Sequence, residues 1–259
     1  MIKSECKRLL FSKGMLMGIV IGLAIVIWHQ VVYVWNPNVE INNGLCMENV
    51  YYNWIGGNCG QLQTFLLYFI IPILASLPTG YSYFEDLHSG YIYHFSVRGK
   101  KQTYLAGKIL ATFLTGALVV IIPLAASFLL TAMRFPLLYP EPVMELGPDL
   151  ISFDIGFYYQ HPLWHTILFI LVDGIFFGGM ALFVLTGTFM LNHKFSVMIT
   201  PFVISYFLFS LDQILGKNDY SPNYFLIPGF SPHLWWEFFI GFAGIAVNAV
   251  VIYLVGKKI

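Results

Sequence analysis

The chain has 259 residues, of which 58% are hydrophobic and only 10% are charged, and its mean hydropathy is +0.74. A soluble domain carries about 25% charged residues, so this composition excludes an ordinary soluble protein. The net charge is zero and no basic stripe is present, which argues against nucleic-acid binding. Because a membrane-spanning helix needs about 20 apolar residues, the length leaves room for roughly six spans and their loops.

The amino-terminal residues combine a basic segment with a long apolar run. Four basic residues lie between Lys3 and Lys13, and the apolar run that follows continues to about Trp35. This run is too long for the apolar part of a typical signal peptide, and it shows no A-x-A-like cleavage site. We therefore predict an uncleaved first span.

Six apolar segments predict an all-α membrane protein with six transmembrane helices. The third segment is longer than a bilayer requires and should kink near Pro123 or project into the cytoplasm. Pro72 and Pro78 should bend the second segment, and the fourth should permit close helix packing at Gly174, Gly178 and Gly179. The predicted spans are 14–35, 62–83, 103–133, 164–191, 195–215 and 234–255.

The basic residues predict the orientation of these spans. Eleven of the thirteen Lys and Arg residues lie in the amino-terminal segment, in the 80–108 loop, in the 192–194 turn or in the 256–258 tail. Short loops on the cytoplasmic side of a membrane carry most Lys and Arg residues. With an even number of spans, both termini are predicted to be cytoplasmic, and the chain is predicted to form one membrane domain over residues 1–259.

The 80–108 loop contains a short segment with helical periodicity. Its apolar residues recur at i, i+3, i+7 and i+11, and Glu85 and Asp86 lie largely off this apolar face. The pattern predicts a short amphipathic helix over 84–98, with these two acids in water. A helix that lies on the membrane surface without a protein partner fits the same pattern. The residues of the apolar face are Phe84, Leu87, Tyr91 and Phe95.

The order of motifs in this loop is distinctive. An F-x-D/E motif follows a span, then come a Gly, a basic residue, and a Y-L-x-G-K motif that opens the next span. This order resembles the membrane subunits of ABC exporters of the type-2 permease family. That family often carries a Pro before the basic pair, where this chain has Val97, and its large-loop members have longer outer loops. The matching residues are Phe84-Glu85-Asp86, Gly90, Arg98-Gly99 and Tyr104-Leu105-Ala106-Gly107-Lys108.

The resemblance implies a permease that forms the translocation path and is driven by a separate ATPase subunit. Residues 1–13 would be an interfacial elbow helix, and residues 84–98 a coupling helix that docks on the ATPase. Two ATPase copies and a second permease, identical or sibling, would complete the exporter in a bacterial cell membrane. The implied substrates include drugs and antimicrobial peptides, exported in some cases for self-immunity. The implied contact residues are Phe84, Glu85, Asp86, Leu87, Gly90, Tyr91, Arg98 and Gly99.

The chain carries no nucleotide-binding or enzymatic signature of its own. No P-loop G-x-x-x-x-G-K-[ST] occurs, so ATP and magnesium are expected on the partner ATPase and no cofactor on this chain. Neither H-E-x-x-H nor G-x-S-x-G is present. An ion-driven secondary transporter or channel is the alternative function, although it would be expected to carry more intramembrane charge and often two related halves. An intramembrane enzyme is a third possibility.

Asp173 is the one acid deep within a predicted span. A charge at that depth is costly and usually faces a cavity or a partner. Two interpretations remain open from the sequence. Asp173 contacts a substrate or ion, or it forms a structural hydrogen bond to a neighbouring helix.

Cysteines and histidines form two further candidate groups. Cys46 and Cys59 share the first outer loop, where the oxidising side of the membrane favours a disulfide, and two free thiols are the alternative. His161 and His165 have the i, i+4 spacing of metal ligands. Pro162 lies between them and no third ligand is evident, so the pattern predicts interfacial histidines and no metal site.

Overall fold

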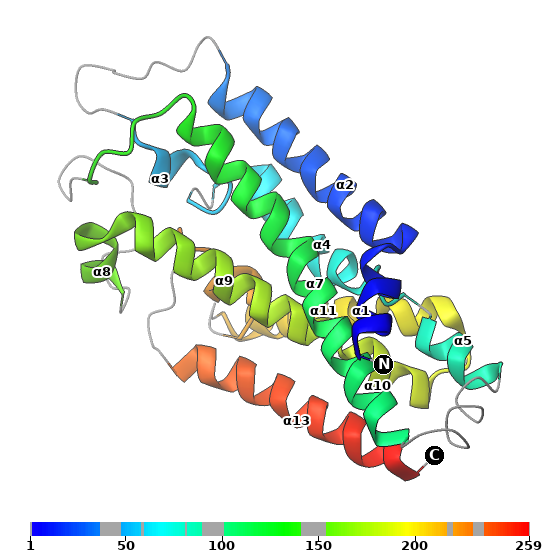
Figure 1. Ribbon diagram of the computed structural model, residues 1–259. Helices are drawn as coiled ribbons and strands as arrows, with labels where there is room; N and C mark the ends of the chain where they lie inside the picture. The colour runs from blue at the N-terminus through cyan, green and yellow to red at the C-terminus, as the bar shows by residue number, and fades with distance from the viewer. Residues whose placement is uncertain are drawn as a thin grey trace.

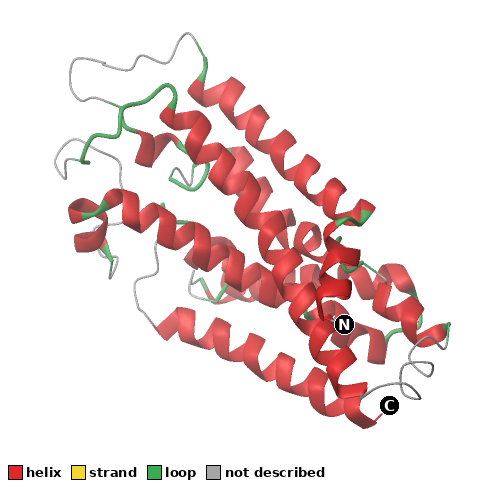
Figure 2. Ribbon diagram, viewed as in Figure 1, coloured by secondary structure: helices red, strands yellow, loops and turns green. Residues whose placement is uncertain are grey.

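The computed structural model describes residues 2–36, 48–57, 60–80, 82–89, 101–140, 154–216, 220–229 and 236–258. These residues form helices and connecting turns, and no strand occurs among them (Figure 2). The all-α prediction is therefore confirmed. The helices are α1 (Ile2–Leu10), α2 (Lys13–His29), the π-helix η1 (Gln30–Val34), α3 (Val50–Asn53), α4 (Leu62–Ser76), α5 (Ser82–His88), α7 (Lys101–Ala132), α8 (Ile155–Gln160), α9 (Pro162–Ala181), α10 (Phe183–Met190), α11 (Lys194–Leu215), α12 (Pro222–Phe225) and α13 (Trp236–Lys258).

Among the described residues, five helical segments are long and apolar enough to cross a membrane. They correspond to the predicted first, third, fourth, fifth and sixth spans. The first consists of α2 followed by η1, and the fourth consists of α9 and α10 with a break at Leu182. The chain therefore fits a multi-pass membrane protein. The five segments are Lys13–Val34, Gln102–Ala132, Pro162–Met190, Lys194–Leu215 and Phe238–Gly256.

The predicted second span is shorter than expected. Its helix, α4, ends at Ser76, so the prediction that the span continues to Tyr83, with bends at Pro72 and Pro78, is wrong about where the helix ends. Fifteen residues at 1.5 Å each extend ~22 Å, compared with the ~30 Å of a hydrocarbon core. Leu77 still has helical φ and ψ, but Pro78 has no amide hydrogen with which to continue the helix, and Gly80 adopts a φ of 45° that favours glycine, so the chain turns after α4.

A buried irregular segment precedes α4. Trp54 and Ile55 are almost completely buried. The Ile55 amide donates to the hydroxyl of Ser127 at 3.2 Å, and the hydroxyl of Thr64 donates to the Ile55 carbonyl at 2.7 Å. Irregular backbone is tolerated at membrane depth only where protein surrounds it and satisfies its polar groups, and this segment meets both conditions.

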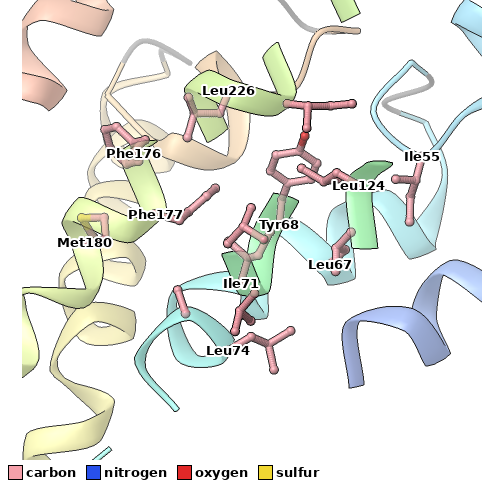
Figure 3. Close-up of a cluster of buried hydrophobic side chains, with 14 of the residues drawn as sticks. Ile55, Leu67, Tyr68, Ile71, Leu74, Leu124, Phe176, Phe177, Met180 and Leu226 are labelled. Atoms are coloured by element: carbon pink, nitrogen blue, oxygen red, sulfur yellow. The ribbon is translucent and has the colours of Figure 1, made fainter. Parts of the chain in front are cut away.

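α4 lies in the middle of the bundle and packs against α2, α7, α9 and α11 (Figure 1). Its inward side chains meet those of α9 in the main buried cluster (Figure 3). Such a central position explains how an apolar helix of moderate length is held in place. The labelled members from the two helices are Leu67, Tyr68, Ile71 and Leu74 of α4, and Phe176, Phe177 and Met180 of α9.

Close contact between α7 and α9 depends on glycine. A Cβ atom at Gly178 would lie 2.7 Å from the backbone oxygen of Phe113, and one at Gly174 would lie 2.5 Å from the side chain of Ile121. The predicted packing role of these glycines is therefore confirmed. α7 itself continues through Pro123 without interruption, and its 32 residues extend ~48 Å, so the helix projects beyond a bilayer core.

One end of the bundle brings together segments that are distant in the sequence. α1, α5, the beginning of α7 and the last turns of α13 all lie at this end (Figure 1). α1 is a separate helix, and Ser12 begins α2 by accepting a hydrogen bond from the Met15 amide at 3.1 Å. The opposite end of the bundle carries α3 and α8.

Candidate functional site

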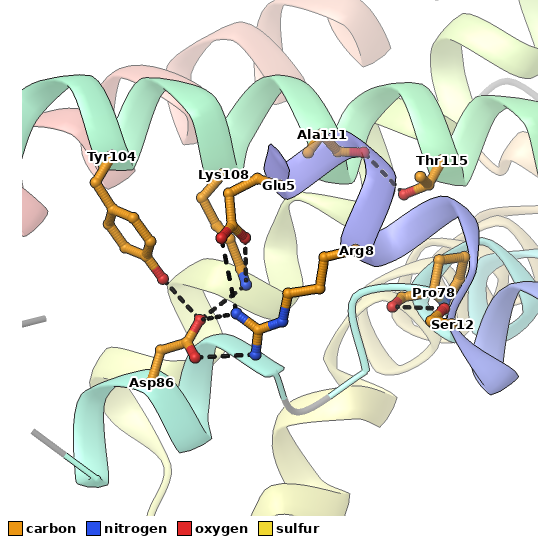
Figure 4. A network of polar contacts seen from close by, with 9 residues as sticks. All are labelled: Glu5, Arg8, Ser12, Pro78, Asp86, Tyr104, Lys108, Ala111 and Thr115. Atoms are coloured by element: carbon orange, nitrogen blue, oxygen red, sulfur yellow. Dashed lines mark hydrogen bonds and ion pairs between the residues drawn. The ribbon is translucent and has the colours of Figure 1, made fainter. Parts of the chain in front are cut away.

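The candidate site is a cluster of charged side chains where α1, α5 and α7 meet (Figure 4). Asp86 of α5 lies at its centre and is only 5% exposed. The Arg8 guanidinium donates to both carboxylate oxygens of Asp86, from Nη1 to Oδ2 at 3.1 Å and from Nη2 to Oδ1 at 3.0 Å. Such a two-point contact fixes the orientation of the guanidinium relative to the carboxylate as well as their distance.

α7 supplies two further donors to the same carboxylate. The Tyr104 hydroxyl donates to Oδ2 of Asp86 at 2.7 Å, and Nζ of Lys108 donates to the same oxygen at 3.0 Å. Tyr104 and Lys108 are four residues apart, so they project from the same face of α7. The cluster therefore joins α5 firmly to α7.

Glu5 of α1 completes the balance of charge. Nζ of Lys108 lies 3.4 Å from Oε2 of Glu5, and Arg8 Nη1 lies 3.7 Å from Oε1. Lys108 is fully buried, and a buried charge is tolerated only where it is paired. Two cations and two carboxylates make the cluster formally neutral, which explains how Lys108 and Asp86 can both be buried.

The cluster lowers the pKa of Asp86. Burial alone would raise it, but the hydrogen bond from Arg8, the charge of Lys108 and the hydrogen bonds from Tyr104 and Lys108 together outweigh burial. The hydrogen bond to Asp86 conversely raises the pKa of Arg8. Arg8 and Asp86 therefore each stabilise the charged form of the other.

Local sequence explains why the three helices can approach so closely. Glu5 and Arg8 lie three residues apart on α1 and so face the same direction. The hydroxyl of Ser12 donates to the carbonyl of Pro78 at 3.3 Å, which ties the start of α2 to the turn after α4. A Cβ atom at Gly14 would lie 2.0 Å from the Leu77 oxygen, so this contact requires glycine.

The other side of α5 faces outward. Glu85 and His88 are exposed, and the Phe84 ring stacks on the His88 ring with their centroids 3.9 Å apart. An open hollow of about 670 Å³ lies beside these residues. α5 thus has one side fixed by ion pairs and one side available for contact. The hollow is lined by Arg8, Phe84, Glu85, Asp86, His88 and Ser89.

Two expectations about this helix are wrong. Asp86 does not lie in water, because Arg8 and Lys108 draw it into the interior. The buried residues of α5 are Tyr83 and Asp86, whereas Phe84 and Leu87, which belong to the predicted apolar face, are both only partly buried. Periodicity within one helix could not reveal this, because the partners of Asp86 come from two other helices.

The described part of α5 ends at His88. Gly90, Tyr91, Arg98 and Gly99 lie outside the described residues, as does the rest of the predicted 84–98 helix. Cys46 and Cys59 also lie outside them, so their disulfide stays a prediction.

Asp173 is completely buried within α9. The Tyr68 hydroxyl of α4 donates to its Oδ2 at 2.7 Å, while its Oδ1 has no hydrogen-bond partner. The structural hydrogen bond to a neighbouring helix, one of the two interpretations of the sequence, is therefore present. A contact with substrate stays a prediction.

The two histidines at the start of the fourth span differ in their surroundings. His161 is exposed, but His165 is 1% exposed and its Nε2 lies 2.7 Å from Oδ2 of Asp154. His165 is therefore buried in the protein beside a carboxylate, and the location of both histidines at the membrane interface stays a prediction. Within the described residues, no group of three or more His, Cys, Asp and Glu side chains could hold a metal ion.

Sequence reasoning missed several members of the charged cluster. The basic character of the amino-terminal segment does not indicate a role for Glu5, although the i, i+3 spacing of Glu5 and Arg8 is a signal that they share a face. Tyr104 and Lys108 belong to the motif that carried the family resemblance, but the motif gave no hint that they contact Asp86.

Comparison with known protein families, with curated proteins and with solved structures gave no match for this chain.

Proposed function

We propose that the chain is the permease subunit of an ABC exporter, with α5 as the helix that couples it to a separate ATPase. The observation that carries this proposal is the charged cluster around Asp86. It joins α5 to α1 and to a long apolar helix, α7, while Glu85 and His88 remain exposed on the other side. A helix held in this way can pass the movement of a docked partner to the spans.

The cluster also gives the two halves of the family motif a physical relation. Asp86 belongs to the F-x-D/E part, whereas Tyr104 and Lys108 belong to the Y-L-x-G-K part, and these residues contact one another. If α5 passes movement to α7, the two motifs on either side of the loop must contact each other. The order of the motifs in the sequence does not require this contact, so the contact is separate support for the proposal.

The proposed topology has six spans, with both termini and α5 in the cytoplasm. α4, together with the buried segment before it, forms the second of these spans. α1 is the interfacial elbow helix. The functional exporter contains two permeases, identical or sibling, and two ATPase subunits that bind ATP and magnesium. It acts in the cell membrane of a bacterium, and its substrates are drugs or antimicrobial peptides.

Glu85 provides the sharpest test because it is exposed and outside the cluster. The tagged chain is purified from its native membrane, and ATP turnover is measured with a P-loop polypeptide identified in the same complex. Glu85→Lys should abolish the turnover, whereas Glu48→Lys, at the other end of the bundle, should leave it unchanged. A complex without a P-loop polypeptide, or equal turnover in all three proteins, would contradict the proposal.

One observation favours the alternative, an ion-driven transporter. Asp173 is buried within an apolar helix and has an oxygen without a hydrogen-bond partner, which is a feature of ion pathways. Proton or sodium uptake by proteoliposomes without ATP, abolished by Asp173→Asn, would favour this alternative over the exporter.

A further inference from the structure

A cavity of about 800 Å³ lies between α9 and α13, away from the charged cluster. Its volume falls within the ~300–1,000 Å³ of typical small-molecule sites. Its walls are almost entirely apolar, and five of the nine lining residues are phenylalanines. The lining residues are Asp154, Phe157, His165, Leu168, Phe169, Val172, Phe238, Phe239 and Phe242.

One end of this cavity contains a buried carboxylate with incomplete pairing. The Asp154 side chain is 9% exposed, and its Oδ2 lies 2.7 Å from Nε2 of His165. Its Oδ1 is buried and has no hydrogen-bond partner. A buried carboxylate oxygen without a partner is costly, and a donor that enters the cavity would remove that cost.

The other lining residues determine which donor fits. None of the described residues that line the cavity is Lys or Arg. The faces of the phenylalanine rings attract cations, and a protonated amine can donate to Asp154 while its apolar part contacts the rings. A neutral apolar molecule would leave Oδ1 of Asp154 unpaired.

We propose that the cavity between α9 and α13 binds an amphipathic organic amine, with its ammonium group on Asp154 and its apolar body against the phenylalanines. His165 positions the carboxylate by donating to its other oxygen. Leu168 and Phe239 are 50% and 65% exposed, so the cavity opens sideways from the bundle. An amphipathic amine could enter by this route from the surrounding membrane.

Dansylcadaverine, an aromatic sulfonamide with a primary amine, is a suitable probe, and its N-acetyl derivative is the matched neutral compound. Binding is measured by fluorescence to the full chain in phosphatidylcholine nanodiscs. We expect the amine to bind about tenfold more tightly than the acetylated compound, as a charge-assisted hydrogen bond predicts. Equal affinities for the two compounds would overturn the proposal.

Two variants locate the binding site. Asp154→Asn should remove the preference for the amine, whereas Glu48→Gln, which removes one negative charge outside the cavity, should preserve it. Leu168→Trp should block the cavity and abolish binding of both compounds, while Leu168→Ala should retain it. Size-exclusion profiles verify that each variant is folded. Unchanged binding in Asp154→Asn or in Leu168→Trp would overturn the proposal.

A membrane lipid with an amine headgroup could also supply the ammonium group that contacts Asp154. Phosphatidylethanolamine carries a primary ammonium, so the measurement is repeated in nanodiscs that contain it. We expect dansylcadaverine to bind with similar affinity in both membranes. Loss of probe binding in the presence of phosphatidylethanolamine would assign the cavity to a lipid headgroup and overturn the proposal of a free amine.

Discussion

At the scale of single residues, the buried carboxylate of Asp86 is matched by donors from distant parts of the chain. Lys108 and Asp86 are both buried, and each contacts the other at 3.0 Å. Asp212 is buried too, and the amides of Tyr220 and Ser221 donate to its two carboxylate oxygens. The sequence could not predict these partners, since Arg8 and Asp86 are 78 residues apart and periodicity describes only one helix at a time.

Removal of Lys108 should be strongly destabilising. Lys108→Met keeps most of the side-chain volume but leaves Asp86 and Glu5 with Arg8 as their only cation. Breaking a buried ion pair costs about 3–5 kcal/mol of unfolding free energy. Thermal unfolding in detergent, followed by circular dichroism, measures the loss. Glu85→Gln, one residue from Asp86 but exposed, is the control and should change stability by less than about 0.5 kcal/mol. Equal melting temperatures for the two variants would exclude a stabilising role of the cluster.

The lowered pKa of Asp86 predicts a pH dependence with a definite sign. A carboxylate whose pKa is lower in the folded state stabilises the fold above its unfolded pKa, and the contribution is lost as the pH falls through the folded value. The cluster should therefore stabilise the protein fully at neutral pH and lose this effect below about pH 4. Melting temperatures from pH 7 to pH 3 should fall more steeply for the wild type than for Asp86→Asn. Parallel pH profiles would disagree with the assignment.

Asp173 can be tested through its hydrogen bond with Tyr68. Asp173→Leu should leave the Tyr68 hydroxyl buried without an acceptor, at a cost of about 1–3 kcal/mol. Asp173→Asn still offers an oxygen and should cost less. In a Tyr68→Phe background the Leu substitution should cost less than in the wild type, because the hydroxyl is already gone. If Asp173→Leu left the melting temperature unchanged in both backgrounds, the hydrogen bond would not be structural and a substrate contact would be favoured.

At the scale of helices, apolar length was a good guide to five of the spans and to their ends, but not to the end of the second. Five predicted spans correspond to helical segments long enough to cross a membrane. The helix of the second ends at Ser76, shortly before Pro78 and Gly80, and the buried segment that precedes this helix obtains hydrogen bonds from Ser127 and Thr64. Contacts of this kind join distant parts of the chain, so hydropathy along the sequence cannot reveal them.

The glycine contact between α7 and α9 gives a prediction at this scale. Gly178→Ala would place a Cβ atom 2.7 Å from the backbone oxygen of Phe113, and that oxygen belongs to a long helix that cannot easily move. Overpacking of this kind typically costs about 1–3 kcal/mol. Gly156→Ala is the matched control, because a Cβ atom at Gly156 meets nothing within 4 Å. The melting temperature should fall for Gly178→Ala only, and an equal effect of both substitutions would contradict the close packing.

At the scale of the whole molecule, the charges and the apolar surface are separated. α11 and α13 lie at the edge of the bundle with many apolar side chains exposed, as helices in contact with lipid or a second subunit would. The charged cluster lies at one end, beside the hollow along α5. Composition predicted the membrane class and the helical fold, whereas the meeting of α1, α5 and α7 depends on tertiary contacts that composition cannot specify.

The central claim is that the exposed side of α5 contacts an ATPase. The most direct measurement places a photo-crosslinking amino acid at Glu85 in the chain expressed in its native membrane, with Tyr139, 68% exposed in another part of the molecule, as the control position. We expect a P-loop polypeptide to be crosslinked from position 85 and not from position 139. A result in which no P-loop polypeptide is crosslinked from position 85, or in which both positions give the same products, would contradict the claim.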